Sequence, residues 1–439
     1  MSTPRSADPK RAATRKRPAE PTTRPFIRER RALTNVGGPS ERSGDPALAD
    51  LLVRALDVEG AVPERSPAQG EAAEPAERAH VHGFHSYPAR MHPETARRLV
   101  EDLSRPGDRV LDPFCGSGTV LVEARLAGRA AIGVDANPLA VRLARLKAGG
   151  STEGERERLV AAAREVADIA GSRREARVGA SRRYGPEDVA LFDPHVLLEL
   201  DGLRVGLDQL GSDALRADLE LVLSAILTKV GKKASDTSDQ ALPRRIAAGY
   251  PAKLFVRKAE ELARRLAEVA PALAAAPPAR VEEGDARELR GIAPGSIDLI
   301  VTSPPYPGIY DYLAHHETRL RWLRLPRASF DRAEVGARRR LDPLGAEEGR
   351  ARWQAELGAI LGAMADVLRP GARAVLLIAD SVIAGEPAFA IDLVRAAAPA
   401  VGLTMRAAAS QERPHFHGPS ARAFARRPRR EHAILLARA

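Results

Sequence analysis

The chain of 439 residues is short of cysteine, of aromatic side chains and of long apolar runs. Its single cysteine, Cys115, excludes a framework of disulfides within the chain and is typical of a reducing compartment, so a cytoplasmic location is expected. No run of about 18 apolar residues occurs, which argues against a membrane-spanning segment. The N-terminus is basic but has no apolar stretch, so no secretory signal is expected. Aromatic residues make up only 4%, and the core must therefore be built mainly from Ala, Leu and Val.

Positive charge is in excess but is unevenly placed. The net charge is +10, and residues 1–31 alone hold ten Lys or Arg against three acids. A basic balance suits a polyanionic partner and gives weak support for nucleic acid. Residues 1–79 are rich in Pro, Arg, Ala, Glu and Ser, which predicts a disordered basic tail and linker, with a short helix at 47–56.

From His80 onwards, short apolar strands alternate with amphipathic helices. The predicted strands are 108–112, 130–135, 279–286, 297–305, 372–380 and 432–439. This alternation predicts an α/β fold with a doubly wound, mainly parallel, Rossmann-like sheet. Helical periodicity without strands predicts an insertion at 150–278. It separates a first half of the domain (80–149) from a second half (279–439).

The stretch "VLDPFCGSGT" (110–119) follows the first strand with a turn of small residues. Gly116 and Gly118 let a ligand approach the backbone, and the next helix starts with free N–H groups. Asp112 would repel a phosphate but pair with a cationic amino group. Asp135 ends the next strand, where a carboxylate can accept hydrogen bonds from both ribose hydroxyls. These features favour a positively charged nucleoside, S-adenosylmethionine, over a dinucleotide.

The stretch "TSPPY" follows the apolar strand "IDLIV". Pro304 and Pro305 fix φ and remove two backbone donors, which leaves acceptors at the strand end, notably Ser303 and the Pro304 carbonyl. The ring of Tyr306 beside them can stack on a base. Such acceptors take the hydrogens of an exocyclic amine and free its lone pair for in-line attack on a methyl group. The target base must leave the stack to reach this loop.

Together, "DPFCGSGT" and "TSPPY" resemble the motifs of the DNA amino-methyltransferases that act on N4 of cytosine or N6 of adenine. The segment "FHSYPARMHPETARRLV" (84–100) resembles the one that precedes the cofactor motif in that family. The resemblance implies a class I methyltransferase fold and S-adenosylmethionine as cofactor. It places His85, Tyr87 and Thr119 at the methionine moiety and Asp285 near the adenine amino group. The full set of expected cofactor-binding residues is His85, Tyr87, Asp112, Pro113, Phe114, Gly116, Gly118, Thr119, Asp135 and Asp285.

The residues expected to act in catalysis are Ser303, Pro304, Pro305 and Tyr306. In the family, serine at the first position of this motif is associated with N4 of cytosine, and Asp or Asn with N6 of adenine. The resemblance therefore favours cytosine-N4 methylation of duplex DNA. Methylation of carbon C5 needs a cysteine nucleophile, and Cys115 lies in the glycine turn instead.

Three other functions remain alternatives at this point: an adenine-N6 DNA methyltransferase, an RNA base amino-methyltransferase, and a DNA-binding protein without catalysis. Residues 229–245 and the arginine-rich 315–340 are candidates for contacting the target, the latter with Arg319, Arg321, Arg324 and Arg338–Arg340 as phosphate contacts. No metal is expected, because His315 and His316 lack partners at metal-ligand spacing. No nuclease signature is evident, so restriction would require a separate endonuclease. The oligomeric state stays open.

Overall fold

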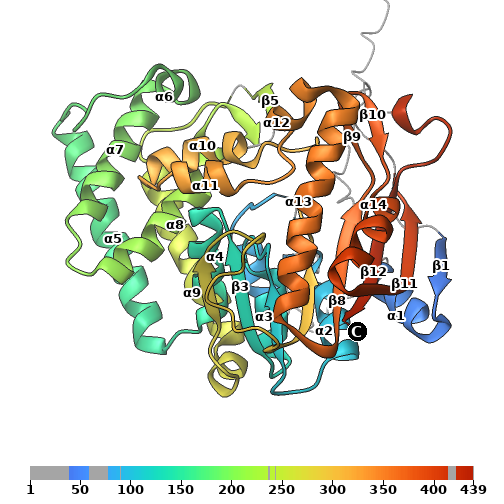
Figure 1. The fold of residues 1–439 in the computed structure, drawn as a ribbon. Helices are drawn as coiled ribbons and strands as arrows, with labels where there is room; N and C mark the ends of the chain where they lie inside the picture. The colour runs from blue at the N-terminus through green and yellow to red at the C-terminus, as the bar shows by residue number, and fades with distance from the viewer. Residues whose placement is uncertain are drawn as a thin grey trace, which may run out of the picture.

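The computed structural model describes residues 39–58, 78–88, 90–235, 238–242, 244–413 and 422–438. Its centre is a sheet with the strand order β1-β11-β12-β8-β7-β2-β3-β6 (Figure 1). In that order the strands are β1 (Ser40–Gly44), β11 (Leu403–Glu412), β12 (Arg430–Arg438), β8 (Leu368–Ala379), β7 (Ile297–Thr302), β2 (Arg109–Asp112), β3 (Ala130–Asp135) and β6 (Arg280–Glu283).

Most of the sheet is parallel. β8, β7, β2, β3 and β6 run parallel to one another, with Val110 opposite Leu299 and Asp112 opposite Gly133. β12 is antiparallel to both β8 and β11, and β1 is antiparallel to β11. The carboxyl ends of β2, β3, β6 and β7 therefore meet at one edge, where the chain leaves each strand for a loop. This arrangement confirms the predicted Rossmann-like sheet.

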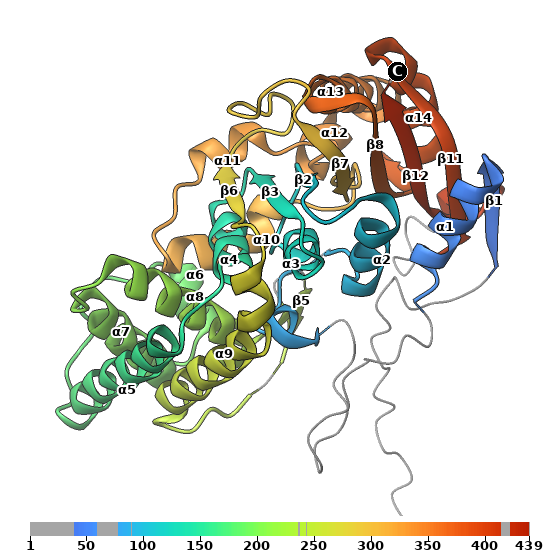
Figure 2. The ribbon, with the colours of Figure 1, turned by 90° about the horizontal axis from the view of Figure 1, so that it is seen from below.

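Helices cover both faces of the sheet, because consecutive strand residues point to opposite sides. Val110 packs into one apolar cluster and Leu111 into the other. The first cluster contains α1 (Pro46–Leu56), α2 (Pro93–Leu103), α3 (Thr119–Leu126) and α4 (Pro138–Gly149). The second contains α13 (Gly345–Val367) and α14 (Ala390–Ala397), which lie together on the opposite side of the sheet from α2 (Figure 2).

The predicted insertion is a separate group of helices beside the β6 edge of the sheet (Figures 1 and 2). Its helices are α5 (Glu153–Glu175), α6 (Pro186–Leu191), α7 (Pro194–Asp208), α8 (Asp213–Val230) and α9 (Tyr250–Ala275). The polar stretch between α8 and α9 forms a small antiparallel hairpin, β4 (Lys233–Ser235) and β5 (Ser238–Ala241).

Between β7 and α13 the chain forms three short α-helices. They are α10 (Tyr312–Trp322), α11 (Ala328–Ala333) and α12 (Arg338–Leu341). A second small hairpin, β9 (Ser381–Ile383) and β10 (Glu386–Ala388), follows β8. A 3-10 helix, η3 (His80–Gly83), precedes α2.

The structure corrects the prediction of a disordered tail over part of residues 1–79. β1 extends the edge of the sheet, and α1 buries Leu52 and Ala55 completely against the first apolar cluster. The Asp45 side chain caps α1 by accepting a hydrogen bond from the Leu48 N–H at 3.1 Å. The polar composition around this segment concealed the apolar face of α1. Residues 1–38 and 59–77 lie outside the described part of the chain. Among the described residues, none of the helices combines the length and the apolar character needed to span a membrane.

Candidate active site

A cavity of about 610 Å³ opens at the carboxyl edge of the sheet and is lined by residues from both predicted motifs. The glycine turn contributes Pro113, Phe114 and Gly116, and the loop after β7 contributes Ser303 and Pro305. The remaining lining residues are Tyr87, Asp135, Ala136, Asn137, Gly284, Ala286, Tyr312, Phe330, Ala333, Glu334 and Val335. Segments nearly two hundred residues apart in sequence therefore share one wall.

The glycine turn needs glycine at two positions for different reasons. Gly116 has φ +49°, and a Cβ there would lie 3.4 Å from the ring of Tyr87. Gly118 has φ +84°, and a Cβ there would lie only 2.9 Å from the Cα of Ala144, where the turn packs on α4. Both are left-handed conformations that favour glycine. The turn thus brings bare backbone to the cavity at Gly116 and fixes the start of α3 at Gly118.

Asp135 lines the cavity and also holds the turn in place. Its Oδ2 accepts from the Gly116 N–H and its Oδ1 from the Asn137 N–H, each at 2.8 Å. Burial raises the pKa of Asp135 to about 6 despite these two hydrogen bonds. A carboxylate in this position gains from further donors on its cavity side, which the hydroxyls of a ribose would supply.

Asp112 is not among the residues that line the cavity. It is buried, and its Oδ1 accepts from the Thr302 hydroxyl at 2.6 Å and from the Phe114 N–H at 3.0 Å. Burial raises the pKa of Asp112 to about 7. Because Thr302 immediately precedes Ser303, Asp112 connects the glycine turn directly to the loop after β7.

The two aromatic residues predicted upstream have different positions. Tyr87 lines the cavity, its hydroxyl accepts from the Asn137 side chain at 3.3 Å, and its ring stacks on that of His316 with centroids 4.8 Å apart. His85 is buried outside the cavity wall. Its Nε2 lies 3.0 Å from the Ser224 hydroxyl and 2.8 Å from Nη1 of Arg319, so it ties α8 to α10.

Two hydroxyls beside the glycine turn are buried with no hydrogen-bond partner among the described residues. They are Oγ of Ser117 and Oγ1 of Thr119, at the start of α3. Such atoms are costly unless a ligand satisfies them. Neither residue lines the cavity, so the groups that fit a nucleoside with hydroxyl donors are the acidic Asp135 and the bare backbone of Gly116.

Asp285 is held by its own neighbour. The guanidinium of Arg287 donates to both carboxylate oxygens, at 2.9 Å from Nε and 2.6 Å from Nη2. Gly284 and Ala286, on either side of Asp285, line the cavity, whereas the Asp285 side chain is not part of its wall.

The loop after β7 divides into a part that lines the cavity and a part that anchors it. Ser303 and Pro305 line the cavity, whereas Pro304 is buried and Tyr306 is half-buried outside its wall. The Tyr306 hydroxyl donates to Oε1 of Glu431 on β12 at 3.0 Å. Burial, and then the Glu431 charge, raise the pKa of Tyr306 well above its usual value.

Sequence reasoning missed several cavity residues. Asn137 had a local signal, since its side chain caps α4 by accepting from the Leu139 N–H at 3.0 Å, as the "DANP" pattern indicates. Glu334 had none. It is buried after α11, accepts from the Leu313 N–H at 3.2 Å, and burial raises its pKa. Only the tertiary fold brings it to the cavity.

A second cavity, of about 450 Å³, lies between the two segments predicted to contact the target. It is lined by Leu191, Leu227, Thr228, Gly231, Lys233, Ala314, His315, Thr318 and Arg319. The burial of Arg319 contradicts its prediction as a phosphate contact, whereas Arg321 and Arg324 form ion pairs and stay predictions. Arg319 is completely buried, Arg321 pairs with Asp188 at 2.8 Å, and Arg324 pairs with Asp208 at 2.9 Å.

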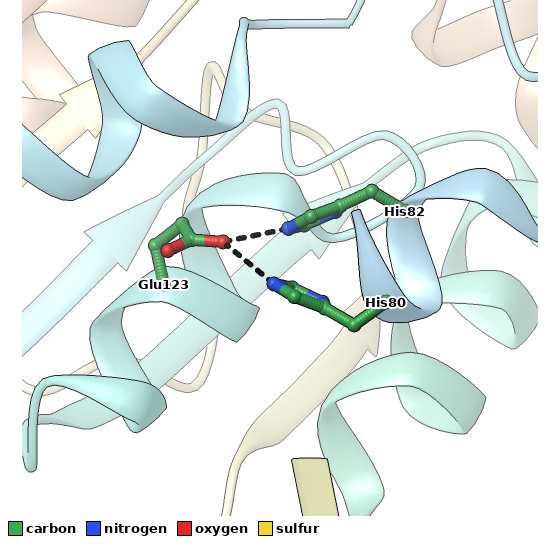
Figure 3. Close-up of side chains that lie close together, drawn as sticks. All are labelled: His80, His82 and Glu123. Carbon is green, nitrogen blue, oxygen red and sulfur yellow. Dashed lines mark hydrogen bonds and ion pairs between the residues drawn. The ribbon is translucent and has the colours of Figure 1, made fainter. Parts of the chain in front are cut away.

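Three residues of metal-ligand type meet behind the glycine turn, where η3 packs on α3 (Figure 3). Nε2 of His82 lies 2.6 Å from Oε1 of Glu123, and Nε2 of His80 lies 3.8 Å from the same oxygen. Two ligands of one tetrahedral zinc ion would be roughly 3.3 Å apart. The His82–Glu123 distance is instead that of a hydrogen bond. Arg90 and Lys147 add positive charge close to His82, which opposes a cation there.

Residues 61–146 match the family model described as DNA methylase. The chain is 37% identical over 68 residues to the type II methyltransferase M.MjaII of Methanocaldococcus jannaschii, covering 16% of this chain and 13% of that protein. It is 51% identical over 51 residues to the tRNA (guanine(10)-N2)-dimethyltransferase of Methanothermobacter thermautotrophicus, covering 11% and 15%. It is 37% identical over 70 residues to the type II methyltransferase M.MvaI of Kocuria varians, covering 15% of each. These matches thus span only a small part of each relative.

Among solved structures, TrmN from Thermus thermophilus is similar at 15% identity, over 79% of this chain and 49% of that one, with a TM-score of 0.30. At that score the superposition does not define the fold, which rests on the strand order. Residues 61–146 therefore resemble a DNA methylase, and the described part of this segment lies within a Rossmann-like, mainly parallel sheet.

Proposed function

We propose that the protein methylates an exocyclic amino group of a base in duplex DNA, with N4 of cytosine favoured over N6 of adenine. The observation that carries this proposal is the shared cavity: Asp135 and Gly116 line one part of it and Ser303 another. The cavity therefore places the site for the nucleoside cofactor next to the acceptors for the amine of a bound base. The link between Asp112 and Thr302 keeps the two parts in register.

Within this proposal each group has a defined task. Asp135 and the backbone of Gly116, which line the cavity, bind and orient the cofactor, which supplies an electrophilic methyl group. Ser303, which lines the cavity, accepts a hydrogen of the target amine, so the nitrogen lone pair is directed out of the base plane. Pro304 and Pro305 contribute no competing N–H donor. The rate gain comes from orientation and from fixed dipoles rather than from a covalent intermediate.

Cytosine is favoured by the serine at position 303, on the family association described above. An aspartate would accept charge-assisted hydrogen bonds, whereas serine offers a neutral hydroxyl. The second cavity, between α8 and α10, supports target contact by the insertion and by the segment after Tyr306 together. A DNA partner, a cytoplasmic location and a separate endonuclease remain parts of the proposal.

The test is mass spectrometry of nucleosides from duplex DNA incubated with the protein and S-adenosylmethionine. We expect N4-methyldeoxycytidine to accumulate with wild-type protein and to be strongly reduced with Ser303→Ala. Accumulation of N6-methyldeoxyadenosine would support amino-methylation of DNA and identify adenine as the target base. If the protein binds the cofactor measurably but forms no modified deoxynucleoside, DNA is refuted as the acceptor.

An RNA acceptor is the second candidate, because one relative is named as a tRNA guanine-N2 dimethyltransferase. That guanine N2 is also an exocyclic amine, so the acceptors around Ser303 suit it chemically. Transfer RNA should be offered beside duplex DNA at equal nucleotide concentration. Methylated nucleoside from the RNA arm alone would establish the second candidate in place of the first.

A further inference from the structure

The strand order indicates which end of the cavity takes the base of the cofactor. Ser303 follows β7, Asp135 ends β3, and β6 lies beyond β3 at the edge of the parallel strands. In S-adenosylmethionine the ribose lies between the sulfonium methyl group and the adenine. With the ribose hydroxyls at Asp135 and the methyl group toward Ser303, the adenine extends toward the end of β6. Gly284, whose N–H donates to the Asp135 carbonyl at 3.0 Å, lines the cavity there.

Two hydrogen bonds dock α11 on this end of the cavity, beside β6 (Figure 2). The Ser329 hydroxyl donates to Oε1 of Glu283, the last residue of β6, at 2.8 Å. Nη2 of Arg287 donates to the Arg332 carbonyl at 3.2 Å. Phe330, between the two contacts in the sequence, is 4% exposed and lines the cavity. The helix thus brings an aromatic side chain to the end of the cavity at β6.

The residue after α11, Glu334, adds a buried carboxylate to the cavity wall. Its Oε1 accepts from the Leu313 N–H at 3.2 Å, and Nη1 of Arg339 lies 2.5 Å from its Oε2. Burial raises the pKa of Glu334, whereas the Arg339 guanidinium opposes that shift by favouring the ionised form. An ionised carboxylate accepts about four hydrogen bonds and donates none. Glu334 therefore has acceptor capacity left for a donor in the cavity.

We propose that α11 and Glu334 form the adenine subsite of the cofactor, with Glu334 accepting from the exocyclic amino group and Phe330 packing on the ring. This inference rests on the cofactor of the proposed function and adds to the contacts of the glycine turn. A carboxylate that accepts matches an aryl amino group that donates, and an aromatic side chain stacks on a purine. Asp285, which is absent from the cavity wall, then orients Arg287 toward the Arg332 carbonyl and supports α11 without touching the adenine.

The experiment compares two ligands by isothermal titration calorimetry of the full chain. One is S-adenosylhomocysteine, and the other is its analogue with purine in place of adenine, which lacks only the exocyclic amino group. Wild-type protein should bind the analogue about 10- to 100-fold more weakly, the range for losing a hydrogen bond to a charged group. Glu334→Gln should bind the two ligands within about threefold of each other, because the charged acceptor is gone. A variant that keeps the wild-type ratio of dissociation constants would overturn the inference.

Phe330→Leu separates the contact with the ring from the contact with the amino group. It removes the aromatic face and leaves the Glu334 carboxylate in place. Both ligands should therefore bind about 5- to 10-fold more weakly, with an unchanged ratio between them. Wild-type affinity for both ligands in this variant would refute the packing of Phe330 on the ring.

The matched control is Glu317→Gln on α10. Glu317 also pairs with an arginine, Arg327, at 3.0 Å, and it does not line the cavity. This variant should keep both wild-type affinities, and an equal change in it would indicate a nonspecific charge effect and contradict the proposal. Thermal unfolding checks that each variant is folded. If Glu334→Gln unfolds, Glu334→Asp keeps the charge at a shorter reach and should also reduce the preference for the adenine ligand.

Ligand binding and methylation are measured separately, so the two proposals can fail separately. If wild-type protein binds S-adenosylhomocysteine but methylates no nucleic acid, the proposed function fails while the ratio of the two ligands still tests the subsite. If Glu334→Gln keeps that ratio and loses kcat instead, Glu334 acts on the target base and the adenine subsite is refuted. If wild-type protein binds neither ligand, both proposals are refuted.

Discussion

The two parts of the cavity are held in place over different distances in the sequence. In the glycine turn, Gly116 bonds to Asp135, 19 positions away. In the loop after β7, Thr302 bonds to Asp112 across 190 positions and Tyr306 to Glu431 across 125. The cofactor part is thus built within one β-α-β unit, whereas the part that faces the target depends on strands from both ends of the domain.

Orienting the groups that face the target therefore demands more of the fold than binding the cofactor does. A cofactor site can be assembled from one turn and one following strand, because it needs only donors and acceptors in a fixed order. The target part is held through the residues on either side of Ser303, because Thr302 bonds to Asp112 on β2 and Tyr306 bonds to Glu431 on β12. Variants on the two sides should therefore affect different kinetic constants.

The largest effect is expected from Ser303→Ala on the target side. It removes a hydrogen-bond acceptor that lines the cavity, and kcat should fall by about 100-fold. Cofactor affinity, measured by isothermal titration calorimetry, should stay at the wild-type value. Ser172→Ala, on the exposed surface of α5, is the matched control. Unchanged kcat in Ser303→Ala would show that the backbone carbonyls suffice without the hydroxyl.

Asp135→Asn should produce the next largest effect, on the cofactor side. The change keeps the shape but removes the charge that accepts from a ribose, and affinity should fall by about 10- to 30-fold. Calorimetry measures the affinity, and Glu288→Gln, an exposed acid after β6, is the control. A variant that binds normally but turns over slowly would place Asp135 on the target side and remove the contrast.

The cofactor part was largely predictable from the sequence, and the target part only in outline. "DPFCGSGT" and Asp135 are close in sequence, so the glycine turn and its acid were evident, as were the strands that end in them. Glu431 and Glu334 carry no local pattern, because their roles exist only after β12 and α11 pack. Asp112 shows the same limit: its strand-end position was predicted, but its bond to Thr302 depends on the parallel pairing of β2 with β7.

Asp112→Asn tests whether Asp112, which joins the two parts of the cavity, has a structural role rather than a role in cofactor binding. Burial raises the pKa of Asp112 from an unfolded value near 4 to about 7, so the folded state binds the proton more tightly. The resulting stability is present below about pH 4 and is lost as pH rises to about 7, by up to about 1.4 kcal/mol per pH unit. Asparagine accepts the same two hydrogen bonds without ionising. The variant should therefore be more stable than wild type at pH 8 and no more stable at pH 4.

Urea unfolding at several pH values measures this difference, and the steeper decline must belong to wild type. Asp135 and Glu123 also have raised pKa values, so both proteins will lose stability with pH, and the difference between them isolates Asp112. If the stability of both proteins declines equally steeply with pH, Asp112 stays ionised in the folded protein through pairing with the cofactor amino group or another cation. Calorimetry on Asp112→Asn then decides, since a loss of cofactor affinity would assign it to binding.

The smallest effect is expected from Asp285→Asn, on the cofactor side. The Arg287 guanidinium already occupies both oxygens of Asp285, and such partly exposed pairs contribute little. Cofactor affinity should change by less than about threefold, because Gly284 and Ala286, not the Asp285 side chain, line the cavity. Arg287→Gln is the informative companion, since it releases the carboxylate without removing it. A tenfold loss of cofactor affinity in Asp285→Asn would mean that the carboxylate leaves Arg287 to bind the adenine amino group. The cofactor part would then also depend on a side chain that rearranges.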